Sequence, residues 1–139
     1  MMMPLSFSVP GSPIPQPRPR VSTRGGFARA YVPAKHPVHR YRASVAEAAK
    51  AAGAAVSEDA VAVELTFLFE RPASHKTKKG LKRDAPTLPR EDVDNLAKAV
   101  LDALTDAGAW GDDSQVVALT VRKKWSWIPH TLITISESP

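Results

Sequence analysis

The residues whose types and spacing could do chemistry lie between Arg90 and Gln115. Seven of the fourteen Asp and Glu residues in the 139-residue chain fall from Glu91 to Asp113, where Lys98 is the only base. The rest of the chain holds eighteen of the nineteen Lys and Arg but only the other seven acidic residues. Clustered carboxylates repel one another and raise one another's pKa unless a cation lies among them. The pattern therefore predicts a site for a hard metal ion.

Asp92 and Asp94 are separated by one residue, just ahead of an expected helix. If Asp92 ends an extended segment, both carboxylates point the same way and can meet one ion. Asp113 is expected to open the strand after that helix, and a short hairpin could return it to the same end. Asp112 is either a further ligand or a cap that orients Asp113. Mg²⁺ prefers such oxygen ligands, so we predict Mg²⁺ as the cofactor, replaceable by Mn²⁺.

Lys98 follows Asp94 by four residues, which places it on the same helix face one turn along. It could orient an attacking water, donate to a phosphate oxygen or help a 3′ oxygen leave. The alternative is a plain ion pair with Asp94, worth roughly 0.2–0.5 kcal/mol. Asp94 could also simply cap the helix. Asp102 and Asp106 are expected on its solvent side.

Other chemistries are excluded by what the chain lacks. An EF-hand loop starting at Asp92 fails, because Ala97 and Ala103 stand where Gly and Glu are required. There is no cysteine, hence no thiolate zinc site and no Cys nucleophile. The four histidines lack zinc-ligand spacing, and there is no Gly-rich phosphate loop or small-molecule cofactor motif.

Two basic, proline-containing segments accompany the acidic stretch. Residues 11–42 hold seven Lys or Arg and no acid, and residues 71–90 hold seven against one Asp. With a net charge of +5 and a pI near 9.7, they indicate a polyanionic partner. The alternatives are a solvated arm and a disordered surface insertion. The predicted phosphate-contacting residues are Arg18, Arg20, Arg24, Arg29, Lys76, Lys78, Lys79, Lys82 and Arg83.

The periodicity of apolar residues predicts one α/β (α+β) domain over residues 1–139, with a small mixed sheet of about four strands packed against two helices. Its length suits one core. Gly53 and Gly108 stand where helices should stop. The expected strands are Leu5–Val9, Ala60–Phe69, Gln115–Val121 and Thr131–Ser136, the expected helices are His39–Ala55 and Asp94–Ala107, and Lys123–His130 is expected to be a connection.

Nothing in the sequence indicates a membrane. Met1–Pro10 lacks the pattern of a signal peptide, and no run of about eighteen apolar residues is present. The absence of cysteine fits a reducing compartment. We therefore expect a soluble cytoplasmic protein.

The ordered run from Asp92 to Val117, DVDNLAKAVLDALTDAGAWGDDSQVV, resembles the core motif of the RusA family of Holliday-junction resolvases, found in bacteria and their prophages. The segment PIPQPRPRVSTRGGFARAYVP, residues 13–33, is also similar to phage-type members. By motif position, Asp92, Asp94 and Asp113 match that family's catalytic carboxylates, and Lys98 matches its catalytically important lysine.

The resemblance implies a homodimeric, magnesium-dependent endonuclease that binds four-way junctions and other branched DNA and cuts two strands symmetrically in recombination and repair. A two-fold dimer supplies one site for each of two equivalent strands. The chain departs from the family at Glu91, where members more often have Pro or a base, and in its longer basic segment 71–90. A branched-DNA binding protein without catalysis, whose carboxylates only cap a helix, is the alternative.

Overall fold

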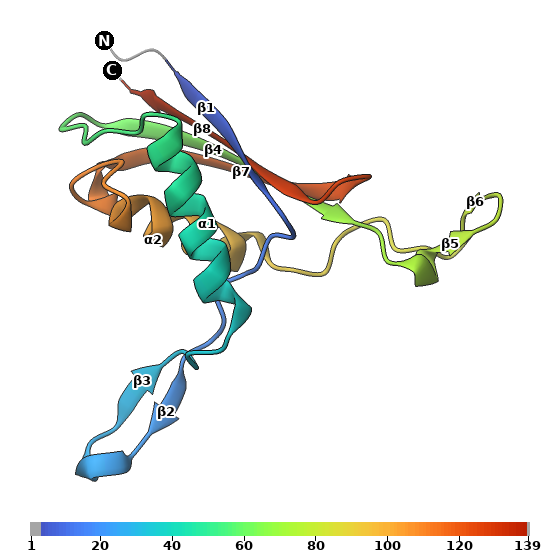
Figure 1. Ribbon diagram of the computed structural model, residues 1–139, viewed down its shortest axis with the longest axis horizontal. Coiled ribbons are helices and arrows are strands. Elements are labelled where there is room, and N and C mark those ends of the chain that lie inside the picture. Colours follow the sequence, from blue (N-terminus) through green and yellow to red (C-terminus); the bar gives the residue numbers. More distant parts are fainter. Residues whose placement is uncertain (1–3, 139) are drawn as a thin grey trace.

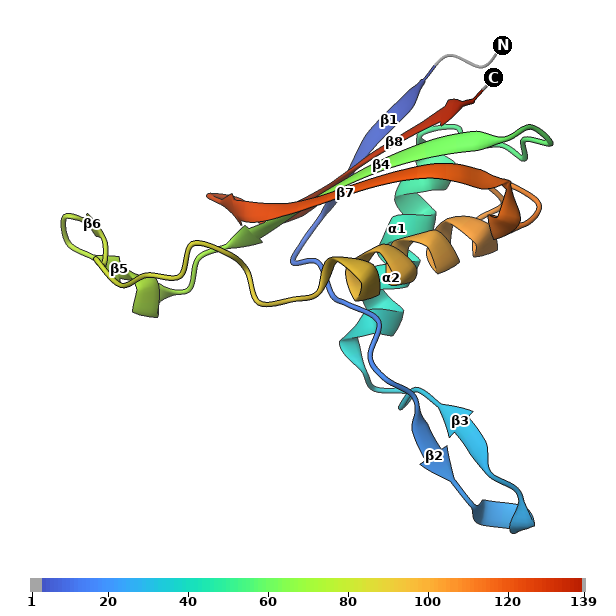
Figure 2. The same cartoon turned by 180° about the vertical axis from the view of Figure 1, so that it is seen from behind.

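A four-stranded mixed sheet carries both helices of the protein on one face (Figures 1 and 2). The structure, a computed structural model, describes residues 4–138, so residues 1–3 and 139 of the predicted domain lie outside it. The fold class predicted from the sequence is confirmed. The sheet strands are β1 (Leu5–Pro10), β4 (Val61–Glu70), β7 (Val116–Ser126) and β8 (His130–Glu137), and the helices are α1 (Pro37–Ala51) and α2 (Val93–Asp106).

The strand order is β1-β8-β4-β7, which puts β4 inside the sheet. Its alternating residues Val61, Val63, Leu65 and Phe67 are buried under the helices. β4 pairs antiparallel with β8, where Leu65 faces Ile133, and parallel with β7, where Leu65 faces Val121. Parallel neighbours need a long crossover, and α2 forms it between β4 and β7.

β7 is longer than predicted and ends at Ser126, so the predicted connection over Lys123–His130 is wrong for its first four residues. Lys123 and Trp125 continue the alternation of Val121 and pair with Phe67 and Phe69 of β4. Charged residues hide this strand in the sequence, although an edge strand tolerates them. Only residues 127–129 join β7 to β8, and they cross the end of β4 because β8 lies on its other side.

The helices end close to the predicted positions. α1 starts after His36, whose Nδ1 accepts a hydrogen bond from the Val38 amide at 3.0 Å, and has Pro37 in its first turn. α2 ends before Gly108, whose φ of +79° is a left-handed conformation that glycine adopts without steric cost. Among the described residues, no helix is long and apolar enough to cross a membrane.

The core joins both helices to the sheet through one cluster of side chains. Tyr41 of α1 shares a 2.6 Å hydrogen bond with Thr131 of β8, and both are buried. Burial raises the pKa of Tyr41 well above its ordinary value, which the bond to Thr131 only partly offsets.

Two small hairpins project from this body, where the sequence predicted irregular loops (Figure 1). The first pairs β2 (Arg20–Ser22) with β3 (Arg29–Tyr31). The second pairs β5 (Lys76–Thr77) with β6 (Gly80–Leu81). Their strands are two or three residues long, too short for an alternation to be visible in a sequence dominated by Lys, Arg and Pro.

Candidate active site

The first turn of α2 presents two exposed carboxylates. Asp92 is the N-cap residue, with extended backbone angles, but its side chain makes no capping hydrogen bond. Asp94 lies inside the first turn, and its Oδ1 accepts a 2.9 Å bond from the Asn95 amide. The alternative that Asp94 caps the helix is therefore wrong, because Asp92 occupies the N-cap position. The unused carboxylate of Asp92 and the exposed one of Asp94 can both serve as ligands.

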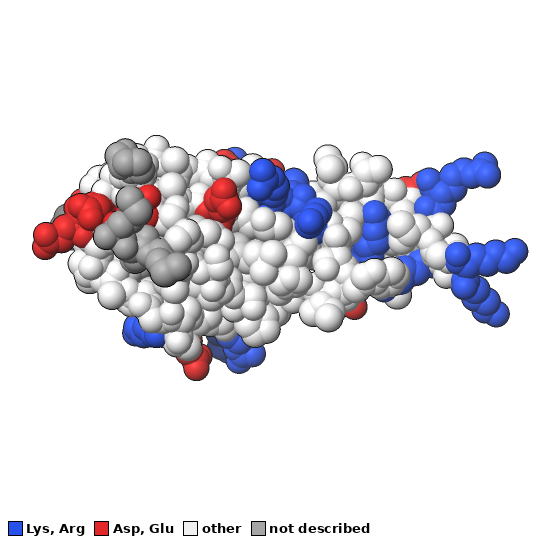
Figure 3. All heavy atoms as spheres, turned by 90° about the horizontal axis from the view of Figure 1, so that it is seen from above, with Lys and Arg blue, Asp and Glu red and all other residues white. Residues whose placement is uncertain are grey.

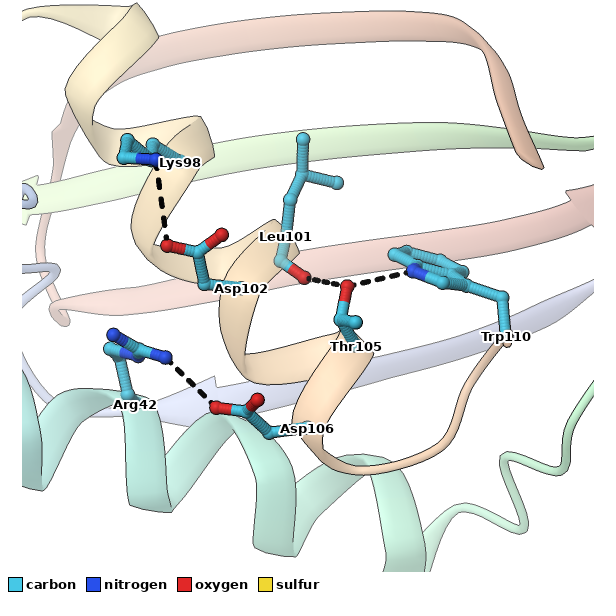
Figure 4. A network of polar contacts seen from close by, with 7 residues as sticks. All are labelled: Arg42, Lys98, Leu101, Asp102, Thr105, Asp106 and Trp110. Carbon is cyan, nitrogen blue, oxygen red and sulfur yellow. Dashed lines mark hydrogen bonds and ion pairs between the residues drawn. The ribbon is translucent and has the colours of Figure 1, made fainter. Parts of the chain in front are cut away.

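Lys98 points along α2 toward Asp102 and not toward Asp94 (Figure 4). The Nζ to Oδ2 distance is 3.7 Å, and the Lys98 side chain is 62% exposed. The predicted alternative of a pair with Asp94 is thus replaced by a pair one turn further on. An exposed i,i+4 pair contributes about 0.3–0.5 kcal/mol, so it does not prevent the ammonium group from contacting a phosphate.

Asp106 lies on the solvent side of α2 as predicted, with its side chain 69% exposed, whereas Asp102 is less solvated than predicted. Asp102 lies within reach of Lys98, and its side chain is 33% exposed. Asp106 accepts a 2.8 Å bond from Arg42 and ties α2 to α1 (Figure 4). Neither residue points only into water.

Asp113 lies in a short 3-10 turn, Asp113–Gln115, and not at the start of a strand as predicted, and Asp112 is the N-cap residue of that turn. The Asp112 carboxylate accepts a bond from the Ser114 amide, and Gln115 Oε1 accepts the Asp112 amide at 3.1 Å. The capping alternative for Asp112 is thereby confirmed. Asp113 takes no part in this cap.

The pKa values of the neighbouring Asp112 and Asp113 are shifted in opposite directions. Hydrogen bonds, first from the Ser114 backbone and then from Asp113, lower the pKa of Asp112. The hydrogen bond with Asp112, and then the charge of that residue, raise the pKa of Asp113, and Asp102 adds to the rise while Lys98 opposes it. Asp113 therefore lies in a field of negative charge, a setting that a cation would relieve.

That field lies beside the later turns of α2, and the first turn is further away. Asp102 follows Asp92 by ten residues, which is about 15 Å along a helix axis. β7, which follows Asp113, begins beside the C-terminal end of α2 (Figure 2). The expected return of Asp113 to the first turn is not seen, and residues 4–138 contain no group of three acidic, His or Cys side chains gathered to hold a metal.

The donor chemistry of the first turn nevertheless fits Mg²⁺. This ion commonly binds proteins through one or two carboxylates and takes its other ligands from water and substrate phosphate. Asp92 and Asp94 provide two such groups, both exposed. The assignment of Asp92, Asp94 and Asp113 as ligands stays a prediction.

Lys123 is a residue of this region that the sequence did not single out. It lies on β7, half-buried, and its Nζ donates a 2.7 Å hydrogen bond to the backbone carbonyl of Glu91. The bond fixes the chain immediately before Asp92 against the sheet. In the sequence, Lys123 alternates with Val121 and Trp125, and this pattern could have indicated that it lies on the same strand face as they do.

The nine predicted phosphate-contacting residues are all exposed. Arg18 precedes the β2–β3 hairpin, and Arg20, Arg24 and Arg29 lie within it. The five residues from Lys76 to Arg83 lie on and just after the β5–β6 hairpin. Figure 3 shows Lys and Arg gathered toward one end of the molecule and Asp and Glu toward the other. DNA contact by these residues stays a prediction.

A sequence model of the family described as endodeoxyribonuclease RusA matches residues 10–136. The chain belongs to the RusA family. The match begins at Pro10, the last residue of β1, and spans both hairpins, both helices, β4, β7 and all but the last residue of β8. The resemblance found on the motif is thus confirmed over most of the chain.

Individual relatives match over different lengths. An uncharacterized protein of Bacillus subtilis (strain 168), YqaN, is 34% identical over 137 residues, which covers 96% of each chain. The crossover junction endodeoxyribonucleases RusA of Escherichia coli (strain K12) and of Enterobacteria phage 82 are 58% identical over 38 residues. That shorter match covers 27% of this chain and 32% of each of those enzymes.

Proposed function

We propose that this protein is a magnesium-dependent, structure-specific endodeoxyribonuclease that resolves four-way DNA junctions by paired cuts, in DNA recombination and repair. The observation that carries the proposal is the RusA-family match over residues 10–136, a span that includes the exposed Asp92, Asp94 and Lys98 of α2. The Escherichia coli relative that matches over 38 residues is named a crossover junction endodeoxyribonuclease, and this name supports a DNA junction as the substrate.

In this proposal Asp92 and Asp94 hold the ion at the start of α2. Asp113 is assigned as the third carboxylate on its motif position alone, because among residues 4–138 it is not gathered with the other two. Bound Mg²⁺ would supply a Lewis acid that activates water and stabilises charge on the scissile phosphate. Lys98 donates to a phosphate oxygen or to the leaving 3′ oxygen. Its weak pair with Asp102 keeps the ammonium group near the substrate without binding it tightly.

The basic surfaces bind the DNA backbone. Arginines on the β2–β3 hairpin and lysines on the β5–β6 hairpin contact phosphates on two sides of the body (Figure 1). Such contacts release counterions. The logarithm of the binding constant should therefore fall linearly with the logarithm of the salt concentration, with a slope of about 0.9 per phosphate contact. A flat salt response would contradict this role.

A homodimer provides the second active site. Two equivalent strands must be cut for a junction to be resolved, and a two-fold assembly presents one site to each. We therefore expect the active species to have twice the chain mass.

The decisive experiment is cleavage of a synthetic four-way junction with and without Mg²⁺. The expected products are ligatable nicks in opposed strands, formed only when Mg²⁺ is present. Asp92→Asn should abolish cleavage and keep binding or improve it, because negative charge is removed. Glu47→Gln, which removes one exposed carboxylate from α1, is the matched control and should cut normally.

A branched-DNA binding protein that does not cut is the second candidate. The absence, within residues 4–138, of three gathered ligand side chains favours it. Junction binding by the unaltered protein without any nick, in Mg²⁺ or in Mn²⁺, would establish this candidate and exclude the nuclease.

A further inference from the structure

A cleft lies between the β5–β6 hairpin and the turn that joins β7 to β8. Its volume is about 460 Å³, within the range typical of small-ligand sites. Its apolar surface comes from Trp125, Trp127 and Leu81, and its charged rim from Arg71, Lys76 and Lys78. None of these residues belongs to the candidate active site.

One wall of the cleft is held firmly. Trp125 is half-buried, and its Nε1 donates to the carbonyl oxygen of Pro86 at 3.1 Å. The guanidinium of Arg71 lies 4.9 Å from the centre of the Trp125 ring and donates to the same carbonyl at 2.8 Å. His75 meets the ring edge-on, with centroids 5.3 Å apart. The wall therefore exists before any ligand binds.

The second aromatic ring of the lining, Trp127, is almost uncovered. Trp127 is 88% exposed, more than any other large hydrophobic residue in the described part of the chain. Exposing an indole to water is unfavourable, and tryptophan gains strongly when a flat partner covers it. Ile128 beside it is 69% exposed, so the turn carries an apolar tip.

The charge of the rim indicates the kind of ligand. Lys76 and Lys78 are exposed, and the lining residues include no Asp or Glu. A ligand that suits this cleft combines a flat ring with a negative group, which is the chemistry of a nucleotide. Base stacking on aromatic side chains beside a cationic groove is the common mode of binding unpaired strands.

The position of the cleft relates it to the acidic site. The segment from Pro86 to Glu91 runs along β7, fixed by Trp125 at one end and by Lys123 at the other. The chain from Pro86 to Glu91 advances five residues, so its two ends are at most about 18 Å apart. A DNA strand near Asp92 can therefore also reach the cleft.

We propose that this cleft binds one unpaired nucleotide of branched DNA, with its base stacked on Trp127 and its phosphate paired with Lys76 and Lys78. Bases inside an intact duplex are stacked on both neighbours and do not enter, whereas a base pair at the branch point of an open junction is stacked on one side only and opens more easily. The cleft thus gives the protein a means of preferring branched DNA to duplex, and it rests on the function proposed above.

The test compares binding of three labelled DNAs: a short duplex, the same duplex with one unpaired thymidine, and a four-way junction. All measurements use the full chain carrying Asp92→Asn, so that no DNA is cut. Trp127→Ala should weaken binding to the bulged duplex and the junction by about 5- to 150-fold, the range for loss of one stacked base. Binding to the plain duplex should change less than about twofold.

Matched variants separate stacking from general effects. Trp127→Phe keeps an aromatic face and should retain most of the preference, whereas Ile128→Ala removes a neighbouring exposed side chain and should change nothing. Lys76→Ala with Lys78→Ala should lower affinity for the bulged DNA more than for the duplex. A single-stranded oligonucleotide should quench the tryptophan fluorescence, and the part of the quenching that is lost in Trp127→Ala reports the stacking on Trp127.

Two outcomes would overturn the inference: equal weakening for all three DNAs in Trp127→Ala, or stronger quenching by an acidic peptide than by the oligonucleotide. If the unaltered protein cuts junctions but Trp127→Ala binds as Ile128→Ala does, only this cleft is refuted. If the unaltered protein neither prefers nor cuts junctions, the proposed function fails first.

Discussion

The two ends of α2 carry carboxylates in opposite circumstances. At the N-terminal end, Asp92 has no capping bond, and Asp94 bonds only to the amide of Asn95. At the C-terminal end, Asp112 caps a turn, and Asp106 pairs with Arg42. The first end leaves its charges available, and the second uses its charges to hold the structure.

Asp113 belongs to neither pattern. It lies beside the second end, where the neighbouring Asp112 raises its pKa, and it takes no part in the cap. The comparison therefore separates acidic residues available to a metal from those committed to the fold, and it leaves Asp113 as the residue that experiments must assign.

The largest effect is expected from Asp94→Asn and Asp113→Asn. If the two residues serve one metal, each change should lower junction cleavage at least about 1,000-fold, because several kcal/mol of transition-state stabilisation is lost. The double variant should then be no slower than the slower single variant, since residues that act as a unit are not additive. Single-turnover cleavage of a labelled junction measures all three rates.

Multiplied losses in the double variant would contradict a shared site and separate the two ends of α2. A shared site and two separate sites also predict different effects on metal binding. Calorimetric titration with Mg²⁺ should show weaker binding in both single variants if they share the ion, and in Asp94→Asn alone if they do not.

A smaller effect is expected from Lys98→Ala. Loss of one charged donor to the transferring phosphate should lower cleavage about 100-fold. Junction affinity should change less than about threefold, because the ammonium group is only one of many phosphate contacts. Lys50→Ala on exposed α1 is the control. Equal losses in cleavage and in binding would leave Lys98 with no role beyond its ion pair with Asp102.

Much of this fold could be predicted because its signals are local and repeated. Alternation along β4 and the apolar face of α2 reflect burial on one side of each element. Gly108 marks the helix end because few other residues adopt its φ of +79°. Strand order could not be read the same way, since the placement of β8 between β1 and β4 depends on contacts far apart in sequence.

The candidate site was predictable in its residue types but less so in its geometry. The run from Asp92 to Asp113 names the carboxylates, whereas their caps and partners depend on one or two residues of helix register. Asp92 and not Asp94 is the N-cap, and Lys98 pairs forward and not backward. Lys123 and the cleft around Trp125 arise from the extension of β7, which its charged residues conceal.

The hairpins show the same limit. Both are basic and both project from the body, but only β5–β6 lines a cleft, whose residue Trp125 is anchored to Pro86. Composition predicts phosphate contact for each. Only the arrangement of Trp125 and Trp127 distinguishes a surface that grips any backbone from one that recognises an unpaired base.

A substitution at the C-terminal end of α2 should affect the stability of the protein more than its catalysis. Thr105 Oγ1 accepts a 2.9 Å bond from Nε1 of Trp110, whose side chain is 1% exposed (Figure 4). Thr105→Val should leave that donor unpaired and lower the free energy of unfolding by about 1–3 kcal/mol. Denaturant titration measures the loss, and Thr87→Val in an exposed segment is the control. Full stability in Thr105→Val would mean that water reaches the indole.

The smallest effect is expected from Asp106→Asn. It removes the 2.8 Å pair with Arg42, but the Asp106 side chain is 69% exposed, so solvent screens the interaction. The free energy of unfolding should fall by less than about 1 kcal/mol, and the fall should shrink further at high salt. Junction cleavage should stay within about twofold of the unaltered protein, because this carboxylate pairs α2 with α1 and is not among the proposed metal ligands. A large loss of cleavage with unchanged stability would show that the second end of α2 also serves catalysis, and the division between the two ends would fall.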